Sequence, residues 1–318
     1  MDDLGTLMRE AVDHVDPMPR QRELWDGVNL ATRRRSRNRL VGGLVAAAVL
    51  VTGGAVAAHQ SSGSEPQPAG PPHAIDRGSS RAVYGIYYAG QTPTGTRLYR
   101  EFRAGQEKEK TLADALDLVE ATPTDPDYVT YWSDGQLLGA TVTNGVIVVD
   151  VDPALTRPGL GGPDAELAIQ QLVYTVQGVV GDRLPVQFVH DGSPVPEVFG
   201  VRTRKPVTDL PELDVLSLVS ISDPSERRVV DGYFSAQGKA SSFEGNVPWQ
   251  LLDANGSVVR SGHAQSYGYE GHLYPWATGH IDVTGLAPGD YTFKVMTDDP
   301  SGGEGPGPYV DTRTIIIK

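Results

Sequence analysis

One apolar segment divides this chain into two unequal parts. Residues 40–58 contain no charged side chain, and at the rise of an α-helix they span roughly 28 Å, about the thickness of the hydrocarbon core of a bilayer. Five arginines lie directly before the segment: Arg33, Arg34, Arg35, Arg37 and Arg39. Because Lys and Arg are retained on the cytoplasmic side, we expect a single-pass signal anchor of the cell membrane, with a cytoplasmic N-terminus and residues 59–318 extracytoplasmic.

Two other export signals have to be weighed against an anchor. Ala55, Val56 and Ala57 resemble the small-residue cleavage site of a secretory signal peptide, but the 39 preceding residues are much longer than an ordinary charged region. The arginines also resemble a twin-arginine signal, although the residues that follow them do not support that alternative. We favour an uncleaved anchor.

Composition limits the functions of the outer part. The chain has no cysteine, so it folds without disulfides and offers no cysteine to a lipid anchor. Residues 59–318 hold 33 acidic and 19 basic side chains, a net charge of −14. Such a surface is not expected to bind nucleic acid, whose phosphates need a basic partner.

The segments on either side of the apolar run differ in pattern. Within residues 1–39, apolar side chains recur at helical spacing, which predicts a cytoplasmic helix whose candidate partner-binding residues are Leu4, Leu7, Met8 and Val12. The alternative is a helix that lies on the inner leaflet or on itself. In residues 59–82, twelve of 24 residues are Gly, Pro or Ser, which is typical of a linker.

Residues 83–208 predict an α+β domain. Thr111 and Asp114 have the spacing of a variant capping box and predict the start of a first helix, and Asn144-Gly145 predicts a tight hairpin. A second helix is expected at 164–180. Strands are expected at 83–89, 97–104, 128–132, 136–143, 146–151 and 185–189.

Residues 214–318 predict an all-β sandwich. Short strand-like stretches are separated by turn signals such as Asn255-Gly256, which is the spacing of sandwich strands. Trp249 and Leu251, and Tyr291, Phe293 and Val295, alternate as inward-facing residues do. The expected strands are 215–221, 228–236, 246–253, 257–264, 277–283, 290–297 and 310–317.

Several blocks of this sequence carry a resemblance to known families. In order, "VYGIYYAG", "TLADALDLVEATP", "GATVTNGVIVVDVDPAL" and "AELAIQQLVYTVQG" make residues 81 to about 208 similar to the GerMN domain of sporulation and spore-germination proteins. The blocks "SISDPSERRVV", "GLAPGDYTFKVMTDD" and "TIIIK" resemble the immunoglobulin-like domain that accompanies GerMN. The resemblance implies a role in envelope or sporulation structures, brings no catalytic residues, and suggests self-association.

The best candidate site in the outer part is aromatic. Tyr267, Tyr269, Tyr274 and Trp276 fall within ten positions, and the intervening glycines and proline predict a loop. Exposed aromatic residues on loops are typical of surfaces that recognise sugars or proteins. The alternative is that these rings cover the end of the sandwich or pack on the GerMN-like domain.

Other side chains that bear chemistry do not form a recognisable catalytic or metal pattern. Asp150 and Asp152 share a face of one expected strand, and the spacing of His263, His272 and His280 matches no known local zinc motif. We therefore predict no catalytic, cofactor-binding or metal residues, and rank an envelope hydrolase that uses Asp150, Asp152 or His263 last.

These patterns predict a non-catalytic, membrane-anchored binding or scaffold protein of the bacterial cell envelope, related to sporulation and germination proteins. Its expected partners are the membrane, envelope proteins or cell-wall components, and further copies of itself. The alternative is a single-pass signalling regulator whose cytoplasmic helix engages a regulatory factor such as a sigma factor.

Overall fold

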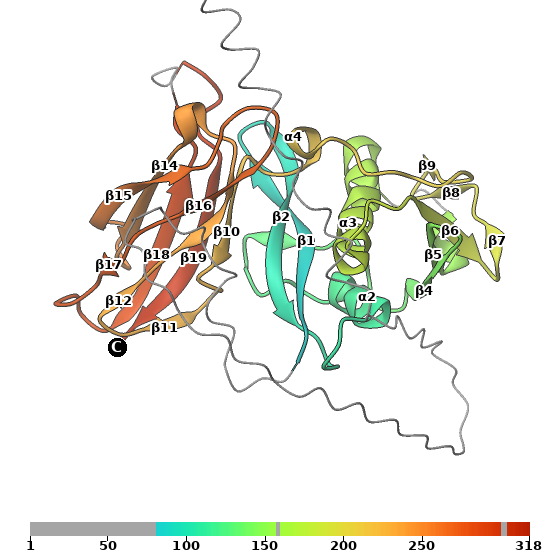
Figure 1. Ribbon diagram of the computed structural model, residues 1–318, viewed down its shortest axis with the longest axis horizontal. Coiled ribbons are helices and arrows are strands. Elements are labelled where there is room, and N and C mark those ends of the chain that lie inside the picture. Colours follow the sequence, from blue (N-terminus) through green and yellow to red (C-terminus); the bar gives the residue numbers. More distant parts are fainter. Residues whose placement is uncertain (1–80, 157–159, 300–303) are drawn as a thin grey trace, which may run out of the picture.

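The computed structural model describes residues 81–156, 160–299 and 304–318, which form an α+β unit followed by an all-β unit (Figure 1). The structure does not describe residues 1–80. The predicted cytoplasmic helix with Leu4, Leu7, Met8 and Val12, the membrane segment 40–58 and all but the last two residues of the linker therefore lie outside the described residues. Among the helices that are described, none combines the length and the apolar character needed to cross a membrane.

The α+β unit has helices between two sheets. The two larger sheets have the strand orders β2-β1-β3 and β4-β5-β6-β7, and α2 and α3 lie between them (Figure 1). Strands β8 and β9 form a separate two-stranded sheet. The elements are β1 (Val83–Thr92), β2 (Gly95–Ala104), α2 (Leu112–Glu120), β3 (Tyr128–Val129), β4 (Leu137–Thr143), β5 (Val146–Val151), η2 (Pro153–Thr156), α3 (Gly162–Val180), β6 (Val186–His190), β7 (Ser193–Pro194), β8 (Glu197–Val198), β9 (Val201–Arg202) and α4 (Glu212–Val215).

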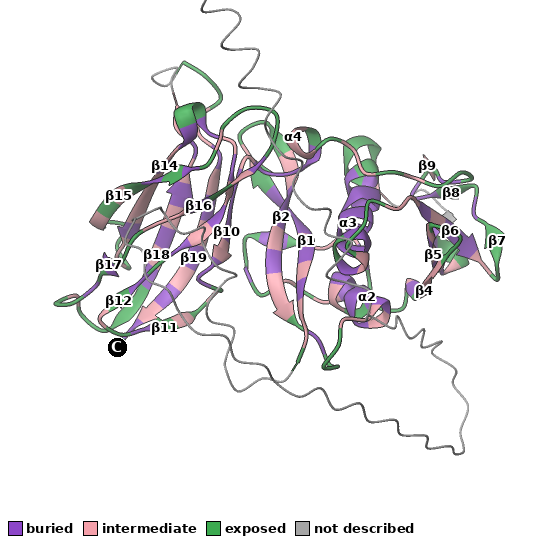
Figure 2. Ribbon diagram, viewed as in Figure 1, coloured by how far each residue is buried: buried purple, intermediate pink, exposed green. Residues whose placement is uncertain are grey.

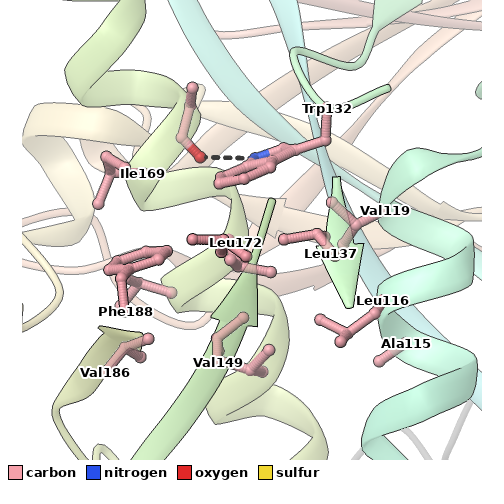
Figure 3. Close-up of a cluster of buried hydrophobic side chains, with 14 of the residues drawn as sticks. Ala115, Leu116, Val119, Trp132, Leu137, Val149, Ile169, Leu172, Val186 and Phe188 are labelled. Atoms are coloured by element: carbon pink, nitrogen blue, oxygen red, sulfur yellow. Dashed lines mark hydrogen bonds between the residues drawn. The ribbon is translucent and has the colours of Figure 1, made fainter. Parts of the chain in front are cut away.

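The core of this unit extends from the first sheet through the two helices to the second sheet. Trp132 is 1% exposed, and its indole Nε1 donates a hydrogen bond of 2.9 Å to the carbonyl of Ala168 in α3 (Figure 3). Its ring lies parallel to that of Phe188 on β6, 6.5 Å away between centroids. Residue 132 was expected at the end of a strand, but β3 stops at Val129 and the chain turns this indole into the core.

The first helix begins at the predicted cap, with one difference. The Thr111 hydroxyl accepts from the amide of Asp114 at 3.1 Å, as a helix cap does. The Asp114 carboxylate does not return to the Thr111 amide, which instead donates to the Tyr84 hydroxyl at 2.8 Å. Asp114 Oδ2 accepts from the amides of Gln106 and Glu107 at 2.9 and 3.0 Å. The carboxylate therefore holds the preceding loop against the helix.

The tight hairpin between β4 and β5 is confirmed. Thr143 pairs with Val146, and the two residues between them have positive φ, 50° at Asn144 and 74° at Gly145. These values are those of the turn that matches the twist of an antiparallel hairpin.

The all-β unit is a single eight-stranded sheet that folds over itself, with one additional two-stranded pair, β12-β17. The strand order is β10-β13-β16-β15-β14-β18-β19-β11. Because the sheet folds over, β10 also packs against β18 and β19. The elements are β10 (Val219–Asp223), β11 (Arg228–Val230), β12 (Tyr233–Phe234), β13 (Gln237–Ala240), η3 (Phe243–Gly245), β14 (Asn246–Leu252), β15 (Val258–Ser266), β16 (Tyr274–Ala277), β17 (Ile281–Asp282), β18 (Gly289–Met296) and β19 (Val310–Ile317).

Alternation along the strands fills the core of this unit as the sequence predicted. Buried residues alternate with less buried ones along β18 and β19 (Figure 2). Leu251, Phe293 and Val295 are fully buried. Trp249 is only partly buried at the edge of the core, 6.0 Å from the Phe293 ring. Strands β13 and β16 are additional to the expected set, and the expected strand 228–236 divides into β11 and β12.

The two units share a broad junction. The β2-β1-β3 sheet lies between the helices and the sandwich (Figure 1), and the amide of Ser217 donates to the carbonyl of Leu98 on β2 at 2.8 Å. An apolar cluster includes Leu98 and Tyr174 of the first unit with Leu216 and Leu273. The connecting segment and the sandwich are therefore packed directly on the α+β unit.

Candidate interaction surface

The structure separates the four aromatic residues singled out by the sequence. Tyr267 is 66% exposed and Tyr269 is 47% exposed, whereas Trp276 is 1% exposed. Tyr274 and Trp276 belong to β16, which pairs with β13 and β15, so only residues 267–273 form the expected loop. Trp276 is a core residue because strand alternation turns it inward. The predicted surface is thus reduced to Tyr267 and Tyr269, with Tyr274 beneath them.

A third exposed aromatic residue lies beside this loop. Phe243 is 50% exposed on η3, a short turn that was not predicted from the sequence. The Ser241 hydroxyl donates to the carbonyl of Tyr269 at 2.9 Å, which joins the two segments. We call the surface formed by Phe243, Tyr267 and Tyr269 the aromatic end. The available signal was a large apolar residue in an otherwise polar turn, Ser-Ser-Phe-Glu-Gly.

Hydrogen bonds hold the loop in one conformation. The Ser266 hydroxyl donates to the carbonyl of Gly268 at 2.6 Å, and the Tyr274 hydroxyl donates to the carbonyl of Glu270 at 2.9 Å. A Cβ atom at Gly268 would lie 2.6 Å from the Tyr274 ring, so only glycine allows this approach. Leu273 is 7% exposed and anchors the end of the loop in the junction. The loop that carries the exposed rings of Tyr267 and Tyr269 therefore has a defined backbone conformation.

The surroundings of the aromatic end are acidic. Glu244 and Glu270 are exposed, and Asp298 and Asp299 are half-buried. The segments 241–246, 266–273 and 297–299 contain no Lys or Arg. An apolar surface with carboxylates at its rim favours a partner that brings cationic side chains and disfavours a polyanion.

The junction between the two units contains a buried ionic cluster that the sequence did not reveal. Arg313 of β19 and Asp125 of the α+β unit are 3% and 2% exposed, and Arg313 Nη1 lies 2.5 Å from Asp125 Oδ2. The same Nη1 atom lies 3.0 Å from Asp311 Oδ1, which also accepts from the Tyr128 hydroxyl at 2.6 Å. Arg313 Nη2 donates to the carbonyl of Ile221 at 3.0 Å. These contacts join both units.

The electrostatics of the cluster are unbalanced, because two carboxylates share one guanidinium. Burial raises the pKa of Asp125 to about 7, although Arg313 opposes the shift, and burial also raises the pKa of Asp311. Burial disfavours the charge of Arg313, yet Asp311, Tyr128 and Asp125 together raise its pKa above the usual value. The guanidinium of Arg313 therefore remains charged, and Asp125 is the carboxyl of the cluster whose raised pKa lies near neutral pH.

The residues considered for metal or hydrolytic chemistry are dispersed. Asp152 Oδ1 accepts from the amide of Ala154 at 2.7 Å, whereas Asp150 Oδ1 lies 4.0 Å from His190 Nδ1. His280 packs edge-on against Tyr233, and His263 lies on β15. No group of three or more His, Cys, Asp or Glu suited to a metal ion occurs within residues 81–156, 160–299 and 304–318.

The fold defines a two-unit protein in which an α+β unit packs directly against an all-β sandwich. Residues 85–196 match a family model described as sporulation and spore germination. Residues 218–304 match a family model described as the immunoglobulin-like domain of bacterial spore germination. Each unit is thus similar to a domain of sporulation and spore-germination proteins, which agrees with the resemblance seen in the sequence. Among curated proteins, none matches this sequence.

Two solved structures share local similarity with the chain. CopC from Methylosinus trichosporium OB3b is 15% identical, with 31% of this chain and 93% of that chain covered and a TM-score of 0.21. A lytic polysaccharide monooxygenase from Jonesia denitrificans is 10% identical, with 30% of this chain and 60% of that chain covered and a TM-score of 0.19. At such scores the likeness carries no functional argument.

Proposed function

We infer that this chain is a non-catalytic binding or scaffold protein of the bacterial cell envelope, anchored in the membrane by residues 40–58. In this proposal the α+β unit is a GerMN domain, and the aromatic end of the immunoglobulin-like domain is the surface that binds a partner. The single observation that carries the proposal is the gathering of Phe243, Tyr267 and Tyr269 on two loops joined by a hydrogen bond. Exposed, preorganised aromatic side chains are effective anchors for a partner protein because little conformational entropy is lost on binding.

The rigid junction supports a scaffold role. A buried cluster of Asp125, Tyr128, Asp311 and Arg313 holds the two domains in one relative orientation. A binding surface on the second domain is therefore presented at a fixed position with respect to the first domain and its N-terminal connection.

In-cell crosslinking tests this function in the full-length chain, which has no native cysteine. A Tyr269→Cys variant is expected to capture a specific envelope protein or wall fragment, identified by mass spectrometry. Ser133→Cys, at an exposed residue of the α+β unit, is the matched control. Adding Phe243→Ala to the Tyr269→Cys variant is expected to reduce the capture. Identical products at both positions, or none at position 269, would contradict the proposal.

The regulator alternative rests on the helical spacing of Leu4, Leu7, Met8 and Val12 in the N-terminal segment. Deleting residues 1–30 distinguishes the two functions. The binding scaffold retains its capture at position 269 and its cellular role without these residues, whereas a regulator loses its effect on its cytoplasmic partner.

A further inference from the structure

The α+β unit carries a basic loop that complements the aromatic end. Arg202, Arg204 and Lys205 are exposed, and none of them lies in an ion pair with any described carboxylate. Three cations within four positions contrast with the strong negative charge of the whole chain, −13. Arg202 is the last residue of β9, and the following residues continue from this strand on the side of the helices away from the sandwich (Figure 1). We call residues 202–205 the basic loop.

A buried threonine fixes the geometry of the basic loop. Thr203 is fully buried between its two exposed arginine neighbours. Its hydroxyl donates to the carbonyl of Val195 at 2.9 Å, and its carbonyl accepts from Gln187 Nε2 at 3.0 Å. These hydrogen bonds fix the position of Thr203. The exposed side chains of its neighbours Arg202 and Arg204 therefore extend into solvent from a backbone of defined position.

The acidic residues beside the aromatic end are fixed in a similar way. Gln265 Nε2 donates to the carbonyl of Glu244 at 2.7 Å, and the Tyr274 hydroxyl donates to the carbonyl of Glu270 at 2.9 Å. Glu244 also has a positive φ of 51°, a backbone conformation that the turn imposes. Both charged surfaces are thus preorganised, which lowers the entropic cost of bringing them together.

We propose that the aromatic end of one copy binds the basic loop of a second copy, so that the protein associates head to tail. Glu244 and Glu270 face the arginine and lysine side chains, while Phe243, Tyr267 and Tyr269 provide apolar and cation–π contacts to them. The two surfaces are different and lie on different units. In a head-to-tail pair one copy keeps its basic loop free and the other keeps its aromatic end free, so further copies add at both ends and association continues into a ring or a filament.

This inference rests on the proposed function, because it names the partner of the aromatic end. A few exposed ion pairs give weak association in solution. The proposed membrane anchor raises the effective concentration of neighbouring copies and makes such weak contacts sufficient.

Paired cysteine variants of the full-length chain test the contact. His272→Cys lies next to the aromatic end and Pro206→Cys next to the basic loop, and both replace exposed residues without removing a proposed charge. When both variants are co-expressed and treated with a short bismaleimide, we expect a mixed covalent dimer. Each variant alone, and either one combined with Ser133→Cys, gives none. A covalent dimer of His272→Cys with itself would overturn the head-to-tail contact.

Charge reversal provides the second readout. Glu244→Lys with Glu270→Lys in the His272→Cys chain lowers the yield of mixed dimer by about tenfold. When Arg204→Glu and Lys205→Glu are then introduced into the Pro206→Cys chain, the yield of mixed dimer is restored. Such a rescue shows that both altered chains are folded. If neither loss nor rescue occurs, the proposal is wrong.

The outcomes separate this inference from the proposed function. Absence of the mixed dimer, with another envelope component still captured at Tyr269→Cys, overturns self-association and leaves the binding function in place. Absence of any capture at the aromatic end overturns both.

Discussion

Arg313, near the C-terminal end of the sandwich, makes its shortest ion pair with Asp125 of the α+β unit, 188 positions earlier in the chain. Both side chains are almost completely buried, and the pair lies where the β2-β1-β3 sheet meets the sandwich. Because the two residues belong to different units, the ion pair couples the stability of one unit to that of the other.

Replacing Arg313 by alanine is expected to destabilise the protein by about 3–5 kcal/mol, because it leaves Asp125 and Asp311 buried without a counter-charge. Arg227→Ala is the matched control: Arg227 and Asp290 form an exposed pair 3.4 Å apart, and its loss costs less than about 1 kcal/mol. Urea unfolding monitored by tryptophan fluorescence gives both values. Equal losses in the two variants would show that the buried cluster does not stabilise the junction.

The stability of the protein is expected to depend on the protonation of Asp125. Its pKa is raised by burial to about 7, against an ordinary value near 3.9 in the unfolded chain. The folded state therefore holds a proton that the unfolded state has released, so the contribution of this group is complete below about pH 4 and is lost as the pH rises towards 7. The titratable groups that interact with Asp125 include Arg313, Asp311, Asp127 and Tyr128.

Unfolding midpoints measured between about pH 4.5 and 7.5 test this dependence, with Asp125→Asn as the comparison. The amide cannot titrate, so its stability changes less with pH over this interval than that of the wild type. The same slope in both proteins would mean that Asp125 is ionised throughout and that the fall in stability has another source.

The four aromatic residues of the 267–276 segment are expected to separate into two classes on truncation. Trp276→Ala removes a core side chain and costs about 3–5 kcal/mol. Tyr267→Ala removes a ring that is 66% exposed and changes the free energy of unfolding by less than about 0.5 kcal/mol, while it reduces partner capture. Denaturation curves combined with crosslinking at position 269 distinguish these effects. Strong destabilisation by Tyr267→Ala would indicate that this ring packs rather than binds.

Local signals predicted the elements of this fold well. The Asn144-Gly145 turn, the Thr111 cap and the alternation of Tyr291, Phe293 and Val295 each depend on residues close in sequence, and each is present in the structure. Strand β16 was missed because it is only four residues long and its proline and neighbouring glycines suggested a loop.

The junction could not be predicted in the same way. The ion pair between Asp125 and Arg313 depends on the packing of two units, and neither residue belongs to a local motif. Phe243 likewise reaches the aromatic end only because the fold brings η3 beside the loop that contains Tyr269. From the sequence alone, two of the three residues of the candidate surface were found, Tyr267 and Tyr269, together with one tryptophan that belongs to the core.

The conformation of the aromatic loop is expected to depend on Gly268. A methyl group there would approach the Tyr274 ring to within 2.6–2.8 Å, so the ring has to move and its hydroxyl loses the hydrogen bond to the Glu270 carbonyl. Gly268→Ala therefore disturbs Tyr267 and Tyr269 and weakens crosslinking to the partner. Gly279→Ala is the control, because a Cβ there meets no atom within 4 Å. If Gly268→Ala crosslinks as efficiently as Gly279→Ala, the exposed rings bind without the fixed loop conformation, and preorganisation is not the source of their affinity.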